Sequence, residues 1–381
     1  MSWLGFRPWK FGPKLPLPGA ESAALPQART EVDTRAAIDE LSQAIRNNPE
    51  AVEIYLALGN LYRSQGEIER AVQIRNNLIT RPGLAPEFKG KAWFELGRDF
   101  RRGGFLDRAL SAFEEARAIS GDTPAILTAL AKLAADSGEF QHAADLYDSL
   151  HLPVAQAHYL VRLAAETMEK NPALGAKTLK KALRVYPGSV EAWLQALILD
   201  FRSGKDAEAS DTLRQALSAV APALVFTILE GFLQSLGPPA PFGPALGPGT
   251  VFPNGPQADP RVCALVLPVL TDRPADVLLT YYGAWFLLLV GRGPEARVWL
   301  QRCLTLQPDF WPARLELLAL AEDEEGLSPP FQTQLDFFID KARQVKRFVC
   351  GACGLRRETL FFVCPRCQSW HSITFRVKMF G

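Results

Sequence analysis

Four cysteines near the C-terminus are the strongest chemical signal in this 381-residue chain. Cys350 and Cys353 form one Cys-x-x-Cys pair, Cys364 and Cys367 form a second, and ten residues separate the two pairs. Two such turns facing each other bring four thiolates to the corners of a tetrahedron, which is the ligand set of structural zinc sites. Iron accepts the same four sulfurs. The spacing therefore predicts one metal ion, zinc or iron, and leaves the choice between them open.

Other uses of paired cysteines fit this segment less well. A thioredoxin-type dithiol needs one Cys-x-x-Cys beside a strand–helix unit, and no such unit is visible here. Six cysteines in the whole chain are too few for a disulfide-stapled secreted domain. Because four thiolates complete the metal shell, we expect His371 to be a surface residue. A module of this size has little core of its own, so metal binding supplies much of its folding energy.

A repeat of about 34 residues organises most of the remaining chain. A turn residue recurs at spacings of 38, 34, 33 and 33, and an alanine follows it by five positions. The turn residues are Gly66, Gly104, Gly138, Asn171 and Gly204, and the alanines are Ala71, Ala109, Ala143, Ala176 and Ala209. Gly or Asn permits the left-handed turn that ends a helix, and alanine lets two helices approach closely. Arg75 stands where the pattern favours an apolar residue. The pattern predicts an all-α superhelix, a solenoid of helix–turn–helix pairs like the tetratricopeptide repeat.

Composition divides the chain into five parts. We expect an irregular aromatic and basic segment at 1–33, the repeat array at 34–236, a linker at 237–260, further helical repeats at 261–345 and a metal-binding ribbon at 346–381. The linker holds eight prolines and five glycines in 24 residues, which excludes a continuous helix.

Charge and hydropathy limit the partners of the chain. The 42 Lys and Arg balance 41 Asp and Glu, so nothing about the whole chain requires nucleic acid. Residues 341–381 are basic, with nine Lys and Arg against one Glu, and could meet phosphates, anionic lipids or an acidic protein face. The best uncharged stretch, 277–291, is shorter than the roughly 18 residues of a spanning helix. Near the N-terminus, Trp3, Phe6 and Trp9 lie among cations, which predicts peripheral membrane contact or docking on the protein's own surface.

The sequence offers little for catalysis. It contains no Gly-x-x-x-x-Gly-Lys-Ser/Thr loop for a nucleotide, and its four histidines lie in no recognisable nucleophile setting. We therefore expect a non-catalytic protein.

The concave face of a solenoid is lined by the first helix of each pair, and this face is the expected binding surface. At its N-terminal end the candidates for partner binding are Asn60, Arg63, Arg98 and Arg101. Later repeats offer apolar residues instead, namely Val161, Met168, Leu194, Ile198 and Phe201. The pattern predicts a groove that is basic at one end and apolar at the other, with a merely solvated charged face as the alternative.

A repeat array followed by these cysteines resembles the lipopolysaccharide assembly protein B family. The runs ALGNLYRSQGEIERAVQIRNNLI and ELGRDFRRGGFLDRAL look like that family's early repeats, and the four cysteines match its rubredoxin-like module. The resemblance implies an adaptor facing the cytoplasm at the inner membrane. Such proteins work with the membrane protease FtsH to control the deacetylase that commits carbon to lipid A, and gather lipopolysaccharide enzymes. The family normally begins with a membrane-spanning helix, and this chain begins with a proline-broken aromatic and basic segment instead.

Together these features favour a cytoplasmic adaptor in lipopolysaccharide biosynthesis that can attach to the cytoplasmic face of the inner membrane. Its expected partners are an FtsH-type protease and lipopolysaccharide enzymes, and nucleic acid is not an expected partner. Two other hypotheses stay open: a general cytosolic repeat scaffold for another complex, and a nucleic-acid-binding zinc ribbon on a helical scaffold.

Overall fold

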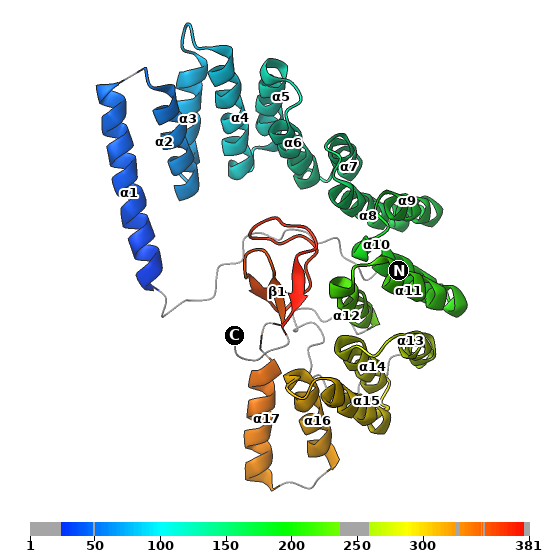
Figure 1. The fold of residues 1–381 in the computed structure, drawn as a ribbon. Helices are drawn as coiled ribbons and strands as arrows, with labels where there is room; N and C mark the ends of the chain where they lie inside the picture. Colours follow the sequence, from blue (N-terminus) through cyan, green and yellow to red (C-terminus); the bar gives the residue numbers. More distant parts are fainter. Residues whose placement is uncertain are drawn as a thin grey trace. The chain divides into compact units, whose positions relative to one another are not determined.

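The computed structural model describes residues 24–48, 50–236, 259–324, 328–343, 345 and 347–376. Within these ranges the chain is helical as far as Arg343 and then forms a small sheet (Figure 1). It divides into two compact units, Met1–Glu166 and Thr167–Gly381. The predicted membrane-contacting residues Trp3, Phe6 and Trp9, and most of the expected linker at 237–260, lie outside the described residues.

The first unit consists of antiparallel helix pairs joined by short turns. Its helices are α1 (Ala24–Asn47), α2 (Val52–Gln65), α3 (Ile68–Ile79), α4 (Pro86–Gly103), α5 (Leu106–Ser120), α6 (Pro124–Asp136), α7 (Phe140–Ser149) and α8 (Pro153–Lys170), the last of which runs past the division. Helix α1 begins inside the range 1–33 that we expected to be irregular, so that expectation is wrong for residues 24–33. Pro26 lies in the first turn of α1, where its missing N–H costs the helix nothing.

The predicted turn and packing positions account for how each pair is built. Gly66 and Gly104 end α2 and α4 in the left-handed conformation, with φ of 82° and 83°. Glycine in the first helix also makes room for a large side chain from the second. A Cβ on Gly97 would lie 2.5 Å from the Phe113 ring, and a Cβ on Gly59 would lie 2.6 Å from the guanidinium of Arg75. Arg75 is fully buried in the place of the expected apolar residue.

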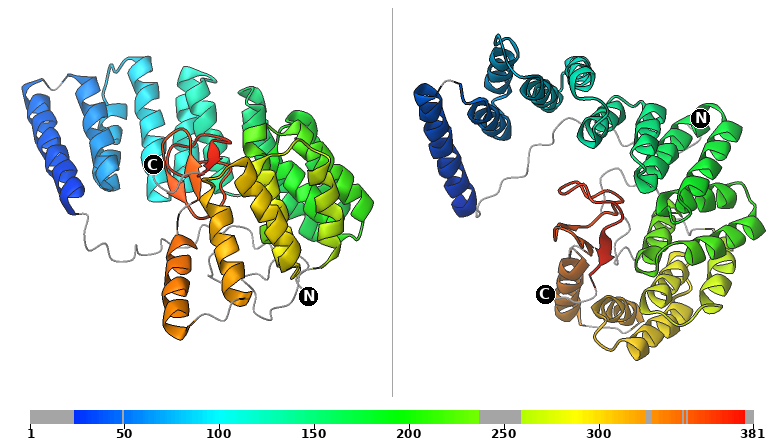
Figure 2. Two further views of the ribbon diagram at one scale, coloured as in Figure 1. Left: turned by 60° about the horizontal axis from the view of Figure 1, so that its bottom comes forward. Right: turned by 45° about the horizontal axis from the view of Figure 1, so that its top comes forward.

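The second unit continues the helix pairs and adds the sheet. Its helices are α9 (Pro172–Val185), α10 (Val190–Arg202), α11 (Asp206–Ala219), the 3₁₀ turn η1 (Pro222–Leu224), α12 (Val225–Leu236), α13 (Arg261–Thr271), α14 (Val277–Leu289), α15 (Gly293–Leu306), α16 (Trp311–Glu324) and α17 (Pro329–Arg343). Figure 2 shows the paired helices of this unit in two further views. None of the helices that the structure describes has both the length and the apolar character needed to cross a membrane.

One predicted turn is different from the others. Asn171 has φ −145° and is the N-cap of α9, where its side-chain oxygen accepts a hydrogen bond from the N–H of Leu174. Helix α9 therefore starts one residue after Asn171, whereas α3 and α5 start two residues after their turn glycines. The register moves by one position, so that Gly175 is buried where Ala176 was expected.

The C-terminal sheet is antiparallel with strand order β2-β1-β3. Its strands are β1 (Phe348–Cys350), β2 (Arg356–Arg357) and β3 (Ile373–Phe375). Phe348 and Phe375 are register partners, and both rings contact Phe226 of α12 at centroid distances of 6.1 and 5.8 Å. The sheet thus shares the apolar core of the second unit instead of forming one by itself.

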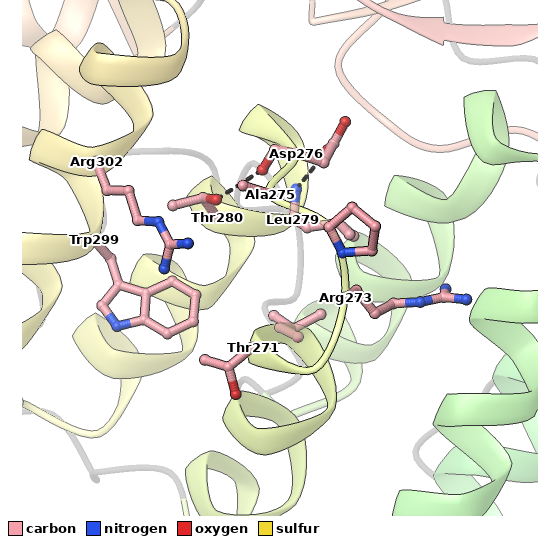
Figure 3. Close-up of a pocket in the computed structure, with 10 residues that line it drawn as sticks. Thr271, Arg273, Ala275, Asp276, Leu279, Thr280, Trp299 and Arg302 are labelled. Atoms are coloured by element: carbon pink, nitrogen blue, oxygen red, sulfur yellow. Dashed lines mark hydrogen bonds between the residues drawn. The ribbon is translucent and has the colours of Figure 1, made fainter.

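A shallow pocket lies at the start of α14, between the α13–α14 connection and α15 (Figure 3). Several of its polar groups are already used within the protein. Asp276 caps α14 by accepting from the N–H groups of Leu278 and Leu279, and Arg273 donates to the Ser218 hydroxyl. The pocket therefore offers a ligand little to bind.

Candidate functional site

The four predicted cysteines meet at one point in the ribbon. Their sulfur atoms all lie within 4.8 Å of one another. The Sγ atoms of Cys350 and Cys367 are 3.7 Å apart, and those of Cys353 and Cys364 are 3.6 Å apart. A tetrahedron with metal–sulfur bonds of about 2.3 Å has edges of about 3.8 Å, so the donor set fits one zinc or iron ion.

Matching turns present the two pairs of ligands. The N–H of Gly354 donates to the carbonyl oxygen of Cys350, and the N–H of Gln368 donates to that of Cys364. The donor residue has a positive φ in both turns, 70° at Gly354 and 62° at Gln368. Each turn therefore folds back on its first cysteine and directs both sulfurs to the same side.

Hydroxyl groups tune the sulfurs, and the sequence analysis missed them. The hydroxyl of Ser372 lies 3.2 Å from Cys350 Sγ, and that of Ser369 lies 3.0 Å from Cys367 Sγ. Burial opposes charge on Cys350, but hydrogen bonds from Ser372, Ser369 and the backbone lower its pKa to about 5. The backbone N–H of Leu355 works to lower the pKa of Cys353, yet burial and the three other sulfurs outweigh it and raise the pKa to about 12. Four thiolates this close together repel one another, so all four can stay deprotonated only when they bind a common cation.

A buried ion pair joins the start of the ribbon to the helices. Arg347 Nη2 lies 3.6 Å from Glu230 Oε1, and the two side chains are 6% and 1% exposed. Glu230 also accepts hydrogen bonds from the Tyr282 hydroxyl at 2.8 Å and the Gln234 amide at 2.7 Å. Burial is the largest single influence and works against the charge on Arg347, but Glu230, Tyr281, Tyr282 and Glu316 together outweigh it, and the pKa of Arg347 is raised. One of the nine cations of residues 341–381 is therefore used inside the protein.

His371 makes a second buried contact, so the expectation that it is a surface residue is wrong. Its Nε2 lies 2.9 Å from a carboxylate oxygen of Glu191 in α10, and the two side chains are 9% and 6% exposed. The His371 ring also packs against Tyr186 with centroids 5.8 Å apart. His371 is thus not a metal ligand but a contact between the ribbon and the repeats.

The predicted partner-binding residues of the first repeats are partly engaged inside the protein. Arg63 donates to Glu95 and Asp99, both at 2.7 Å. The amide oxygen of Asn60 accepts from Arg63 at 2.9 Å and from Arg75 at 2.7 Å. These side chains hold α2, α3 and α4 together, which the sequence pattern did not indicate.

The other two predicted residues are more accessible. Arg98 is half-exposed and pairs with Glu95 at 3.0 Å, and Arg101 pairs with Asp136 of α6 at 2.6 Å. The binding role of all four residues stays a prediction.

The expected apolar end of the groove is wrong for four of its five residues, and the fifth, Met168, is half-buried. Leu194, Ile198 and Phe201 are buried in the core of the second unit, and Val161 is buried in the first. Helix α12 covers this side of α10, where Gly231 packs on Leu194 and Phe232 contacts Phe201 with ring centroids 5.5 Å apart. These apolar residues follow the repeat because they fill the core.

Comparisons with known proteins agree with this architecture. The family profile described as Tetratricopeptide repeat matches residues 32–76 and 94–151. Lipopolysaccharide assembly protein B of Escherichia coli strain K12 is 27% identical over 348 residues, covering 88% of this chain and 84% of the relative. The protein of the same name from Haemophilus influenzae (strain ATCC 51907 / DSM 11121 / KW20 / Rd) is 44% identical over 70 residues, 18% of each chain.

Among solved structures, a tetratricopeptide repeat protein from Parabacteroides merdae is 16% identical. The match covers 76% of this chain and 98% of that one, with a TM-score of 0.35. The repeat pattern, the paired helices and the profile match define a non-catalytic scaffold of the kind that binds other proteins. The chain carries tetratricopeptide repeats at residues 32–76 and 94–151 and a four-cysteine cluster near its C-terminus, and it is similar to lipopolysaccharide assembly protein B over 88% of its length.

Proposed function

We propose that this protein is an adaptor in lipopolysaccharide assembly. The similarity to lipopolysaccharide assembly protein B along 88% of the chain carries this proposal, because it spans the repeats together with most of the rest of the molecule. The finer hypothesis is that the repeats present the lipid A-committing deacetylase to an FtsH-type protease on the cytoplasmic face of the inner membrane. The same surface would gather other lipopolysaccharide enzymes.

The metal centre has a structural role in this proposal. All four positions around the ion are cysteine sulfurs, which leaves no open position for a substrate or water. The ion, zinc or iron, would hold the two ligand turns together. The ribbon would in turn stay docked on the repeats through Arg347 and His371.

Affinity purification tests the adaptor role directly. The tagged full-length chain is expressed in a Gram-negative host, crosslinked in living cells, purified and analysed by mass spectrometry. We expect enrichment of an FtsH-type protease and of lipopolysaccharide enzymes over the tag alone. Depleting the protein should also raise the level of the deacetylase, as measured by immunoblot.

Two results would contradict the adaptor role. The first is a partner set without any lipopolysaccharide enzyme, combined with an unchanged deacetylase level after depletion. The second is enrichment of RNA or DNA in place of proteins, which would support the nucleic-acid hypothesis.

A further inference from the structure

The four metal-binding cysteines differ in their contact with solvent. Cys350 and Cys364 are buried, and Cys353 is half-buried. Cys367 is exposed, and the residues on either side of it are exposed as well. A small oxidant dissolved in water therefore reaches the sulfur of Cys367 more readily than any other sulfur of the donor set.

A second sulfur lies within reach of Cys367. Its Sγ is 3.7 Å from Cys350 Sγ, and the Ser369 hydroxyl faces both sulfurs, at 3.0 Å from Cys367 and 3.6 Å from Cys350. A disulfide bond is about 2.05 Å long, so the two sulfurs must approach by about 1.7 Å to form one. Cys350 is held in β1 as the register partner of Ile373, whereas Cys367 lies in an exposed turn that can supply this movement.

The two cysteines outside the ribbon lack these features. Cys263 and Cys303 are 2% and 0% exposed. Burial raises the pKa of both thiols, to about 12 for Cys303. Because the thiolate is the form that reacts with oxidants, these two thiols serve as unreactive internal references for Cys367.

We propose that Cys367 is an oxidation site, at which hydrogen peroxide creates a disulfide bond to Cys350 and thereby removes two ligands of the metal ion. The Cys367 thiolate attacks one peroxide oxygen, the O–O bond breaks, and the leaving hydroxide takes a proton from the solvent. This step leaves a sulfenic acid on Cys367. The Cys350 thiolate then attacks that sulfur, the S–O bond breaks, and the second hydroxide is also protonated. Two thiolates thus give up two electrons in total, and one peroxide is reduced to two water molecules.

The disulfide would change the metal site more than the fold of the ribbon. Only Cys353 and Cys364 remain as thiolates, and two sulfurs do not complete the four positions that hold the ion. The new bond joins the two ligand turns in place of the ion. The contacts of Arg347 and His371 with the helices use no sulfur, so the ribbon stays attached. A thiol reductant reverses the change.

Peroxide titration of the full-length zinc-loaded chain tests the site. Zinc is used because it has no redox chemistry of its own. Hydrogen peroxide is added below one equivalent, and zinc release is followed with a coloured chelator. Differential alkylation and mass spectrometry report the state of each cysteine. We expect one zinc ion released per disulfide, a Cys350–Cys367 bond in the peptide map, reduced Cys263 and Cys303, and zinc binding again after treatment with dithiothreitol.

Two histidine variants separate Cys367 from the other ligands. Cys367→His and Cys353→His each keep four ligands, in a set of three cysteines and one histidine that zinc accepts. Only Cys367→His lacks the exposed sulfur. At equal peroxide it should therefore release zinc at least about tenfold more slowly than Cys353→His. Zinc content and hydrogen exchange in β1 and β3 before the addition of peroxide show whether both variants are loaded and folded.

Three results would overturn the inference. They are a first oxidation at Cys353 or Cys364, oxidation of Cys367 without a bond to Cys350, and equal rates of zinc release from the two histidine variants. If a variant does not load zinc, the peptide map of the unchanged chain decides by itself. The proposed adaptor function does not depend on any of these outcomes.

Discussion

Replacing Arg347 with methionine should loosen the ribbon from the repeats without touching a metal ligand. The change removes the only cation paired with Glu230 among the described residues, and it keeps an unbranched apolar side chain in the same space. The carboxylate of Glu230 would remain 1% exposed, with the Tyr282 hydroxyl and the Gln234 amide as its remaining donors.

The expected loss follows from that environment. Removing one partner of a buried ion pair typically costs about 3–5 kcal/mol, because the other charge stays buried without compensation. Two hydrogen bonds remain on Glu230, and the original contact is 3.6 Å long, so we expect a value near the lower limit, about 3 kcal/mol. With a urea dependence of about 3 kcal/mol per molar, the unfolding midpoint of the second unit should fall by about 1 M.

The Glu230→Gln change completes the test as a double-mutant cycle. Glutamine can still accept from Tyr282, so the Arg347→Met, Glu230→Gln pair should be more stable than the sum of the single changes by at least about 2 kcal/mol. Urea unfolding is followed by tryptophan fluorescence, and metal release to a coloured chelator identifies the transition of the unit that carries the ribbon. Arg366→Met, at an exposed position of the ribbon, is the control.

An unchanged midpoint for Arg347→Met would refute the argument, and so would additive effects of the two changes. Either result would mean that the pair does not hold the ribbon on the helices.

Other predictions concern the metal centre and the first repeats. Ser372→Ala removes a hydrogen-bond donor to Cys350 Sγ and should speed metal transfer to a chelator about tenfold. The control Thr374→Ala, whose hydroxyl bonds to a backbone carbonyl, should leave the rate unchanged. Equal transfer rates for the two variants would contradict the role of the Ser372 hydroxyl. Because thiolates must stay deprotonated to hold the ion, the metal should be lost as the pH falls. Ser372→Ala removes a hydrogen bond that lowers the pKa of Cys350 and should therefore move that loss to higher pH. Chelation, or Cys364→Ser, should increase hydrogen exchange in β1 and β3, and unchanged protection would argue against a structural ion. Gly59→Ala places a Cβ 2.6 Å from the Arg75 guanidinium and should destabilise the first unit by about 2 kcal/mol. Adding Arg75→Met to this variant should restore part of the lost stability, as measured by thermal unfolding. An unchanged melting temperature for Gly59→Ala would show that Arg75 can move.

The helix pairs were predictable because their signals are local. A glycine with a left-handed backbone ends a helix wherever it stands, so Gly66 and Gly104 mark their turns without help from the rest of the chain. Asn171 shows where this reasoning stops. The same residue type that tolerates a left-handed turn also caps a helix N-terminus, and the choice depends on whether the next helix begins one or two residues after it.

Residues that link distant segments were not predictable in the same way. His371 and Glu191 are 180 positions apart, and no periodicity relates them. Leu194 and Phe201 gave an apolar stripe that suits a groove or a core equally well, and the packing of α12 decided for the core. Arg75 departs from the apolar pattern of the repeat, and the structure explains the departure. Gly59 leaves space for its side chain, and Asn60 and Asp99 accept its hydrogen bonds.

The amino-acid sequence by itself determined the repeat, the turns and the four sulfur ligands, since each depends on residue types at short fixed spacings. Only the tertiary structure decided which charges remain available. It placed Arg63, Arg75 and Arg347 in internal ion pairs. Electrostatic pairing depends on distance in space and on burial, and these are properties of the packed chain.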